Sequence, residues 1–249
     1  MKNLAYKLNE EIEIVYKSIF IKTLNAIVIS DLQIGEELYL LKERGIAIPQ
    51  FQLKEMKETI KKIASYSKAK KLIINGDLKH EFGEASEQEW REVIDFINFS
   101  KKLFEEIIVV RGNHDNYLLN IISKLPVKFY QPYFKEKYFL FTHGHLKIKV
   151  EKEKYLIIGH EEPCLSLKEK FTKVKFPCLL FGNYNKKTKI ICLPAFSPIS
   201  SGTEINIVEK DELLSPLLKE SDFYNLEVYV IEKDAGIVKF PKLKFLSVL

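Results

Sequence analysis

Side chains that bind metals or transfer protons recur in this sequence directly after short apolar runs. The clearest example is 111–115, Arg-Gly-Asn-His-Asp, which follows the β-branched run 107–110. Such a run predicts a buried strand, and Gly112 marks its end. An amide oxygen, an imidazole and a carboxylate then lie where a strand becomes a loop, which is where open α/β sheets bind their ligands. The segment therefore predicts a functional site beyond the carboxyl end of a sheet.

Four further strand ends repeat this pattern. They supply Asp31 and Gln33, Asp77 and His80, His143 and His145, and His160 with Glu161 and Glu162. All five histidines of the chain lie in these loops and in 111–115. Clustered imidazoles and carboxylates tolerate burial poorly unless they bind a metal, so the set indicates a metal centre rather than scattered structural residues.

The ligand types favour a pair of divalent cations. Two ions about 3.5–4 Å apart require a bridging carboxylate, and Asp77 lies on the central motif, where a bridge is geometrically convenient. Carboxylate, amide and imidazole ligands suit manganese best, with magnesium, iron and zinc as alternatives. Such a pair lowers the pKa of a bridging water and aligns it with a phosphorus atom. Hydrolysis of a phosphoric ester by in-line attack is therefore the chemistry that we expect.

Composition limits the class of protein. With 249 residues, 46% hydrophobic and 29% charged, the chain can bury a large core and is expected to be globular. Its net charge of +5 permits a polyanionic partner without requiring one. No apolar stretch approaches the roughly 18 residues needed to span a bilayer, and the N-terminus lacks a signal-peptide core. A cytoplasmic protein without membrane contact is therefore predicted.

The cysteines carry no metal or redox motif. Cys164, Cys178 and Cys192 are odd in number and lack C-x-x-C spacing, which argues against a zinc ribbon or a redox pair. Cys178 and Cys192 lie in apolar runs and are predicted to be small buried hydrophobic residues.

Apolar patterning in the first half alternates strands with helices. Strands are predicted at 13–16, 18–21, 26–30, 71–75 and 107–110, and a helix at 51–68. The segment 34–49 between them is predicted to be a lid or helical loop. Ser86-x-x-Glu89 forms a capping box that predicts the start of a second helix. The expected buried face of that helix consists of Trp90, Val93, Ile94 and Ile97.

The second half is richer in strands. After a short helix near 117–124, strands are predicted at 138–142, 155–158, 178–181, 188–192 and 226–231. No linker or repeat interrupts the chain, so we expect one domain over 1–249, built from two packed sheets with helices outside. The apolar segment 213–218 is expected either to join the core or to contact a partner, such as a second subunit in a homo-oligomer.

The ordered motifs resemble those of the calcineurin-like metallophosphoesterases. The matching segments are Asp31-x-Gln33, Gly76-Asp77, 112–115, His143-Gly-His145 and Gly159-His160-x-Glu162. The resemblance spans residues 20–200 and implies a four-layer α/β/β/α sandwich of two mixed sheets with outer helices. The segments 76–82, 159–163 and 193–197 are similar to a prokaryotic subfamily typified by the ligase-associated DNA damage response endonuclease.

The resemblance also implies roles for individual residues. Asp31 would bind the first of two divalent metal ions, Asp77 would bridge both ions, and the second ion would be bound by Asn113, His143 and His160. His114 would protonate the leaving oxygen or stabilise the transition state, and Asp115 would orient it.

Three residues around these ligands have less fixed roles. His145 is equally compatible with a ligand and with a residue that orients one. His80 is expected to hydrogen-bond to a ligand rather than to bind metal. Arg111 could contact a phosphate, but an ion pair at the strand end is the favoured interpretation.

Two departures from the family pattern fall on the first metal. The family usually has His at the positions of Gln33 and Glu162. One interpretation is a rebuilt site of oxygen ligands, Asp31, Gln33, Asp77 and Glu162, which would favour manganese or magnesium over zinc. The other is a weakened first site and a one-metal or inactive protein. Because Glu162 restores a negative charge, the rebuilt site is the favoured interpretation.

The leading prediction is a metal-dependent phosphodiesterase that acts on DNA or RNA ends. The nucleic-acid part comes from the resemblance, because the lysine clusters at 61–62, 68–71 and 101–102 are interspersed with Glu and are typical of solvated helix surfaces. The alternatives are a phosphatase or nucleotide phosphodiesterase for small molecules, and a binding or scaffold protein that has lost the first metal.

Overall fold

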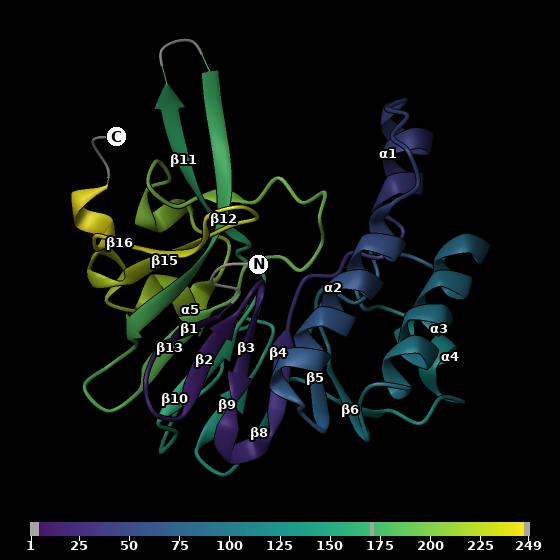
Figure 1. Ribbon diagram of the computed structural model, residues 1–249, viewed down its shortest axis with the longest axis horizontal. Helices are drawn as coiled ribbons and strands as arrows, with labels where there is room; N and C mark the ends of the chain where they lie inside the picture. The colour runs from purple at the N-terminus through teal and green to yellow at the C-terminus, as the bar shows by residue number, and fades with distance from the viewer. Residues whose placement is uncertain (1–4, 170–171, 247–249) are drawn as a thin grey trace.

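The structure, a computed structural model, describes residues 5–169 and 172–246 (Figure 1). Within these residues, the first sheet has seven strands in the order β1-β2-β3-β4-β5-β6-β7. The strands are β1 (Ala5–Lys7), β2 (Ile12–Val15), β3 (Ser18–Ile21), β4 (Ala26–Ile29), β5 (Lys71–Asn75), β6 (Glu106–Val110) and β7 (Lys128–Tyr130). β4 to β7 are parallel, whereas β1 to β4 form antiparallel pairs. The carboxyl ends of β4, β5 and β6 therefore meet at one edge.

The second sheet has nine strands among the described residues and is also mixed. They are β8 (Phe134–Glu136), β9 (Phe139–Phe141), β10 (Tyr155–Ile158), β11 (Pro163–Glu169), β12 (Thr172–Asn183), β13 (Lys189–Cys192), β14 (Thr203–Glu204), β15 (Glu227–Glu232) and β16 (Gly236–Phe240). β9, β10 and β13 run parallel, so the loops that follow them also leave at one edge.

The α-helices lie outside the two sheets (Figure 1). They are α1 (Glu36–Arg44), α2 (Gln52–Ser67), α3 (Glu87–Lys101), α4 (Leu118–Ile122) and α5 (Pro216–Glu220). Short 3-10 turns are formed by Lys22–Leu24, Lys210–Glu212, Phe223–Asn225 and Leu243–Phe245. In the described part of the chain, none of the helices is both long and apolar enough to cross a membrane.

Alternation along the strands separates three apolar cores. In β4, Ile27 and Ile29 pack toward α2 and α3, whereas Val28 faces the second sheet. In β9, Phe139 and Phe141 face the first sheet, whereas Leu140 faces the opposite side and packs in the outer core with α5. The result is the predicted four-layer arrangement of helices, two mixed sheets and helices.

Two elements project from the same end of the molecule (Figure 1). One is α1, and the other is the long hairpin of β11 and β12, whose register pairs Cys164 with Pro177 and Glu169 with Thr172. β12 continues from this hairpin into the second sheet, where it pairs with β13 and β15.

Most predicted elements are present with boundaries shifted by only a few residues. The prediction that Trp90 is buried on α3 is wrong, because its side chain is 38% exposed, and Phe96 contributes to the core instead. Cys178 and Cys192 are buried as predicted. In the segment 213–218, Leu213, Leu217 and Leu218 join the outer core, whereas Leu214 remains 58% exposed.

Candidate metal centre

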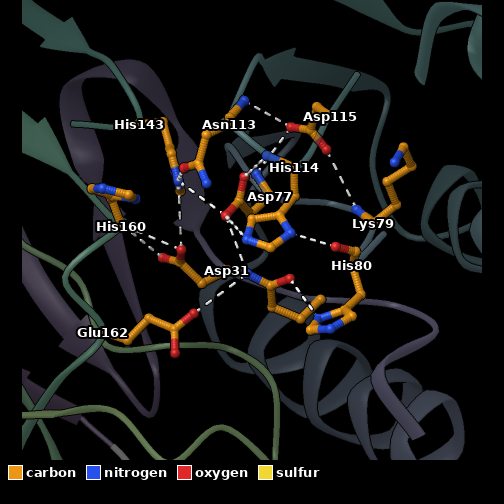
Figure 2. Close-up of polar contacts among 12 residues, drawn as sticks. Asp31, Asp77, Lys79, His80, Asn113, His114, Asp115, His143, His160 and Glu162 are labelled. Atoms are coloured by element: carbon orange, nitrogen blue, oxygen red, sulfur yellow. Dashed lines mark hydrogen bonds and ion pairs between the residues drawn. The ribbon is translucent and has the colours of Figure 1, made fainter. Parts of the chain in front are cut away.

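The predicted site residues lie on loops that follow parallel strands of the two sheets. β4 and β5 lead to Asp31 and Asp77, and β6 leads to Asn113 and His114, all from the first sheet. In the second sheet, β9 leads to His143 and β10 to His160 and Glu162. Figure 2 shows these side chains pointing toward one another. Because both sets of parallel strands end at the same edge of the sandwich, residues 129 positions apart, such as Gln33 and Glu162, converge on one point.

The backbone at the ligand positions has an unusual conformation. Asp31, Gln33, Asp77, His160 and Glu162 have φ angles of 55°, 50°, 52°, 66° and 48°. Left-handed backbone is uncommon for residues other than glycine and carries a steric cost, so it persists only where the surrounding structure enforces it. Loop pairing does so here, since the amides of Leu32 and Gln33 donate to the carbonyl oxygen of Asp77 at 2.9 and 3.0 Å. The loops are therefore held in the shape that turns these side chains inward.

Glycines allow the loops to approach this closely. A Cβ atom on Gly112 would clash with Oδ1 of Asp77, and one on Gly159 would clash with the side chains of Ser30 and Asp31. The glycines of the predicted motifs are therefore required by the packing of the ligands.

Acceptor atoms converge at the position predicted for the second metal. His143 Nε2 lies 3.1 Å from Asn113 Oδ1 and 3.2 Å from Asp77 Oδ2. One ligand atom from each of Asp77, His143 and His160 lies within 4.8 Å of the others. Nδ1 of His143 contacts the carbonyl oxygen of Asn75 at 3.1 Å and must donate to it, which leaves Nε2 facing two oxygen acceptors. This arrangement requires a positive charge, which a metal ion bound by Nε2 and the two oxygens would supply, so these residues fit a metal ion.

The histidines around this position differ in protonation. Burial lowers the pKa of His143, but the carboxylates of Asp77 and Asp31 outweigh it and raise the pKa to about 10. Burial and the nearby His143 lower the pKa of His160 to about 3 and that of His145 to about 4. In the absence of an ion, a proton on His143 therefore compensates the carboxylates. His160 is neutral and ready to bind metal.

The position predicted for the first metal is arranged differently. Gln33 Nε2 lies 3.1 Å from Asp77 Oδ2 and 3.5 Å from Glu162 Oε1. The amide oxygen faces away from them and contacts His80 Nδ1 at 3.1 Å. An N–H₂ group has no lone pair for a metal, so the first position does not fit an ion in this arrangement.

Hydrogen bonds also engage the remaining carboxylates of the first position. Asp31 accepts bonds from the backbone N–H of His160 at 3.1 and 3.2 Å. Glu162 Oε2 accepts a bond from the hydroxyl of Ser200. Burial raises the pKa of both Asp31 and Glu162 above the ordinary carboxyl range. The first position is thus stabilised by protein donors.

Asp115 has a different role from the one predicted. Its carboxylate accepts bonds from backbone amides, which are those of Asp77 at 2.9 Å, Gly112 at 2.7 Å, Leu78 at 2.9 Å and Lys79 at 3.4 Å. Burial and the neighbouring Asp77 raise the pKa of Asp115 to about 6, although the amides act in the opposite direction. The prediction that Asp115 orients the ring of His114 is wrong, because this carboxylate fastens the loop after β5 to the loop after β6.

The ring of His114 is oriented by backbone instead. Its Nδ1 contacts the carbonyl oxygen of His80, so Nδ1 carries the proton and Nε2 faces the centre, 3.8 Å from Asp77 Oδ2. Phe82 packs on the other side, with ring centroids 3.7 Å apart, and is itself 57% exposed. His114 thus lies between the ligands and an exposed aromatic side chain.

Arg111 and His145 flank the centre. Arg111 donates to the side-chain oxygens of Asn116 at 2.6 Å and Gln131 at 3.3 Å. In the described parts of the chain, no carboxylate lies within ion-pair distance of Arg111, so the favoured strand-end ion pair is wrong. The ring of His145 lies 5.4 Å from that of His143 between centroids, and its buried Nδ1 has no hydrogen-bond partner among the described residues.

Several residues behind the centre were missed by sequence reasoning. Gln52 donates to the carbonyl oxygens of Leu32 and Gln33 at 3.2 and 2.9 Å and to Ser197 Oγ at 3.1 Å. Lys17 donates to the carbonyl oxygen of Ser197 at 2.9 Å. Of these residues, Ser197 alone lies in a segment that resembles the prokaryotic subfamily, 193–197, and that resemblance implies no role for it. Ser197 links both sheets, since its backbone N–H donates to the carbonyl oxygen of Asp31 at 3.1 Å.

An open cleft of about 340 Å³ leads to the centre. It is lined by Gln33, Asp77, Asn113, His114, His160, Glu161, Glu162, residues 201–203 and Leu214. Both candidate ion positions therefore face a space that a substrate can enter.

Comparison with known proteins identifies the family. The family model of the calcineurin-like phosphoesterases matches residues 24–226. The chain belongs to this family. Membership implies a divalent-metal-dependent hydrolase of phosphoric esters, in agreement with the group formed by Asp77, His143 and His160.

A solved structure shows the same fold at low sequence identity, and another matches with a lower TM-score. Nuclease MPE of Pseudomonas putida matches with a TM-score of 0.64 and 16% identity, covering 91% of this chain and 95% of the nuclease. Yfce, a phosphoesterase from E. coli, matches with a TM-score of 0.41 and 17% identity, covering 84% and 88% of the two chains. A search of curated proteins finds no match.

Proposed function

We propose that this protein is a metal-dependent phosphodiesterase that acts on nucleic acid. The observation that carries the proposal is the convergence of Asp77, Asn113, His143 and His160 on one position, with His114 beside it, at the floor of an open cleft. A bound divalent ion would supply Lewis-acid activation of a phosphoryl group and of the attacking water.

The protein's own residues would do the rest of the chemistry. Nδ1 of His114 is committed to the carbonyl oxygen of His80, so only Nε2 can exchange a proton with a substrate oxygen. We assign His114 the protonation of the leaving oxygen or the stabilisation of charge in the transition state. Asn75 would keep His143 in the tautomer that binds metal, through the 3.1 Å contact with Nδ1.

The proposal of a nucleic-acid substrate has two supports. Phe82 is an exposed aromatic ring against the proposed catalytic histidine, and such rings stack on unpaired bases. The fold likeness to nuclease MPE of Pseudomonas putida is the second support. We therefore favour single-stranded ends or flaps of DNA or RNA, and a role in DNA repair, over small molecules.

Manganese is the ion that we propose for the second position. A carboxylate, an amide oxygen and two imidazoles form a mixed oxygen and nitrogen set that suits manganese or iron more than magnesium or calcium. The two-ion form predicted from the sequence would require the Gln33 amide to rotate so that its oxygen faces Asp77.

The test is manganese-dependent hydrolysis of a chromogenic phosphodiester, compared with a chromogenic monoester. We expect activity that chelation abolishes and manganese restores, with a preference for the diester. Asp77→Asn should remove it, whereas Asp211→Asn, an exposed acidic residue far along the chain, should not.

Other outcomes would favour the alternatives. A preference for the monoester would favour the small-molecule phosphatase. The absence of activity with manganese, magnesium, iron, zinc or cobalt would favour a binding or scaffold protein and would overturn the proposal.

A further inference from the structure

The amide of Gln33 lies where an ion would have to enter the first position. Its nitrogen is 3.1 Å from Asp77 Oδ2 and 3.5 Å from Glu162 Oε1. An amide nitrogen carries two hydrogens, one for each of these carboxylates. We infer that the Gln33 side chain replaces the first metal ion and that this protein works with a single ion, at the position formed by Asp77, Asn113, His143 and His160.

The orientation of this amide is fixed from both ends. At the far end, its oxygen contacts His80 Nδ1 at 3.1 Å, and the ring of His80 packs against Tyr39 with centroids 4.7 Å apart. The His80 backbone is held as well, since its N–H donates to Ile34 at 3.0 Å and to Glu89 at 2.8 Å. Rotating the amide by half a turn would place its oxygen against two carboxylates, at 3.1 and 3.5 Å.

The backbone of Gln33 offers no alternative approach. Its N–H donates to the carbonyl oxygen of Asp77 at 3.0 Å, and its carbonyl oxygen accepts from Gln52 at 2.9 Å. The φ angle of Gln33 is 50°, a left-handed conformation that persists because these backbone hydrogen bonds enforce it. The backbone position of Gln33 is therefore fixed, and it places the side-chain amide next to the two carboxylates.

The carboxylates of the first position are satisfied without a cation. Glu162 uses one oxygen for Gln33 and the other for the hydroxyl of Ser200. Asp31 accepts from the backbone of His160. By contrast, the second position brings together His143 Nε2, Asn113 Oδ1 and Asp77 Oδ2, of which Asp77 Oδ2 also accepts the bond from Gln33. An ion entering the first position would have to displace the hydrogen bonds that Gln33 and Ser200 already make to these carboxylates.

The experiment counts ions and reads their coupling, so it does not depend on catalysis. Chelator-treated protein is titrated with manganese, desalted and measured by elemental analysis and electron paramagnetic resonance. We expect one manganese per chain and the six-line signal of an isolated ion. Gln33→His, which replaces the donor with an imidazole acceptor, should bind a second ion at least tenfold more tightly than the parent and show a spin-coupled spectrum.

Two other ion counts would overturn the inference. Two ions per parent chain with a coupled spectrum would mean that the amide turns to accept the first ion. One ion in both proteins, with Gln33→His folded by circular dichroism, would mean that Gln33 is not what closes the position. The inference rests on the metal dependence proposed above. A parent chain that binds no ion would overturn that dependence, whereas one bound ion without hydrolysis would overturn only the proposed activity.

Discussion

The two ion positions of this centre share Asp77 but differ in how their polar atoms are satisfied. At the second position, an amide oxygen and a carboxylate oxygen face one ring nitrogen of His143, and a ligand atom of His160 lies close by. At the first position, the Gln33 amide and the Ser200 hydroxyl supply hydrogens to the carboxylates. The comparison teaches that loops of similar shape can present donors at one position and acceptors at the other. Under the single-ion proposal, this balance of donors and acceptors sets the number of ions, and one side chain is enough to change it.

The largest effect should come from removing a ligand of the second position. His143→Ala is expected to lower diester hydrolysis by about 10³-fold or more and to abolish retention of manganese, because it removes a ligand whose Nε2 faces the ion. Glu162→Ala, at the first position, should keep the ion and lose less than about tenfold in activity. Both variants are measured by elemental analysis and steady-state kinetics. Equal losses of activity and of bound manganese in the two variants would contradict the proposed difference between the positions.

The next effect concerns the residue on which both positions depend. Asp115→Ala removes a buried carboxylate that accepts four backbone N–H groups, including that of Asp77. We expect a loss of about 4 kcal/mol in the free energy of unfolding, because the amides lose a charged partner and remain buried. Urea unfolding of the metal-free protein measures it, with Asp211→Ala as the exposed control. A loss below about 1 kcal/mol would show that the loops are held without Asp115.

The sequence predicted the frame of the centre better than its details. Continuous apolar runs predicted β4, β5, β6 and β10, because a strand that is buried on both faces is apolar at successive positions. The glycine-flanked motifs then placed the candidate ligands at the strand ends.

The direction of individual hydrogen bonds was not predictable. The family resemblance implied that Asp115 orients the adjacent His114, whereas the fold brings the backbone of residues 77–79 to it. The Gln33 amide could be a ligand or a donor, and the choice depends on His80, which is 47 residues away. Contacts between loops decide such questions, and no local pattern records them.

A pH dependence separates the positions further. In the ion-free protein, the pKa of His143 is about 10, above its ordinary value of about 6.5, so its charged form stabilises the fold at pH below about 6.5. That contribution is lost as the pH rises toward 10. An ion must replace this proton, so manganese affinity should rise about tenfold per pH unit between pH 7 and 9, with one proton released.

Calorimetry in buffers of different ionisation enthalpy measures this proton release. His160 should release none, because its pKa of about 3 leaves it neutral over this range. An affinity that does not change with pH would mean that His143 is not protonated in the ion-free centre.

The smallest expected effect concerns Phe82, the exposed ring that packs against His114. Phe82→Ala should raise the KM for a single-stranded oligonucleotide about fivefold, which corresponds to the loss of roughly 1 kcal/mol of stacking. It should leave hydrolysis of a small chromogenic diester unchanged, because that substrate has no base. Trp90→Ala, an exposed aromatic residue on α3, is the matched control. Equal effects on both substrates would place Phe82 in support of His114 rather than in contact with a base.

The left-handed backbone of the centre also limits how its chemistry can evolve. Five candidate ligand residues, Asp31, Gln33, Asp77, His160 and Glu162, share a conformation that excludes β-branched side chains. Variants with Val, Ile or Thr at these positions would be disfavoured by the backbone conformation itself, whatever their effect on activity. Asn, Asp, His and Gly tolerate this conformation best, and three of these four carry atoms that bind metals or donate hydrogen bonds. Substitutions that keep this backbone therefore favour polar side chains, and Gln33→His would place a residue that tolerates this conformation better than Gln does.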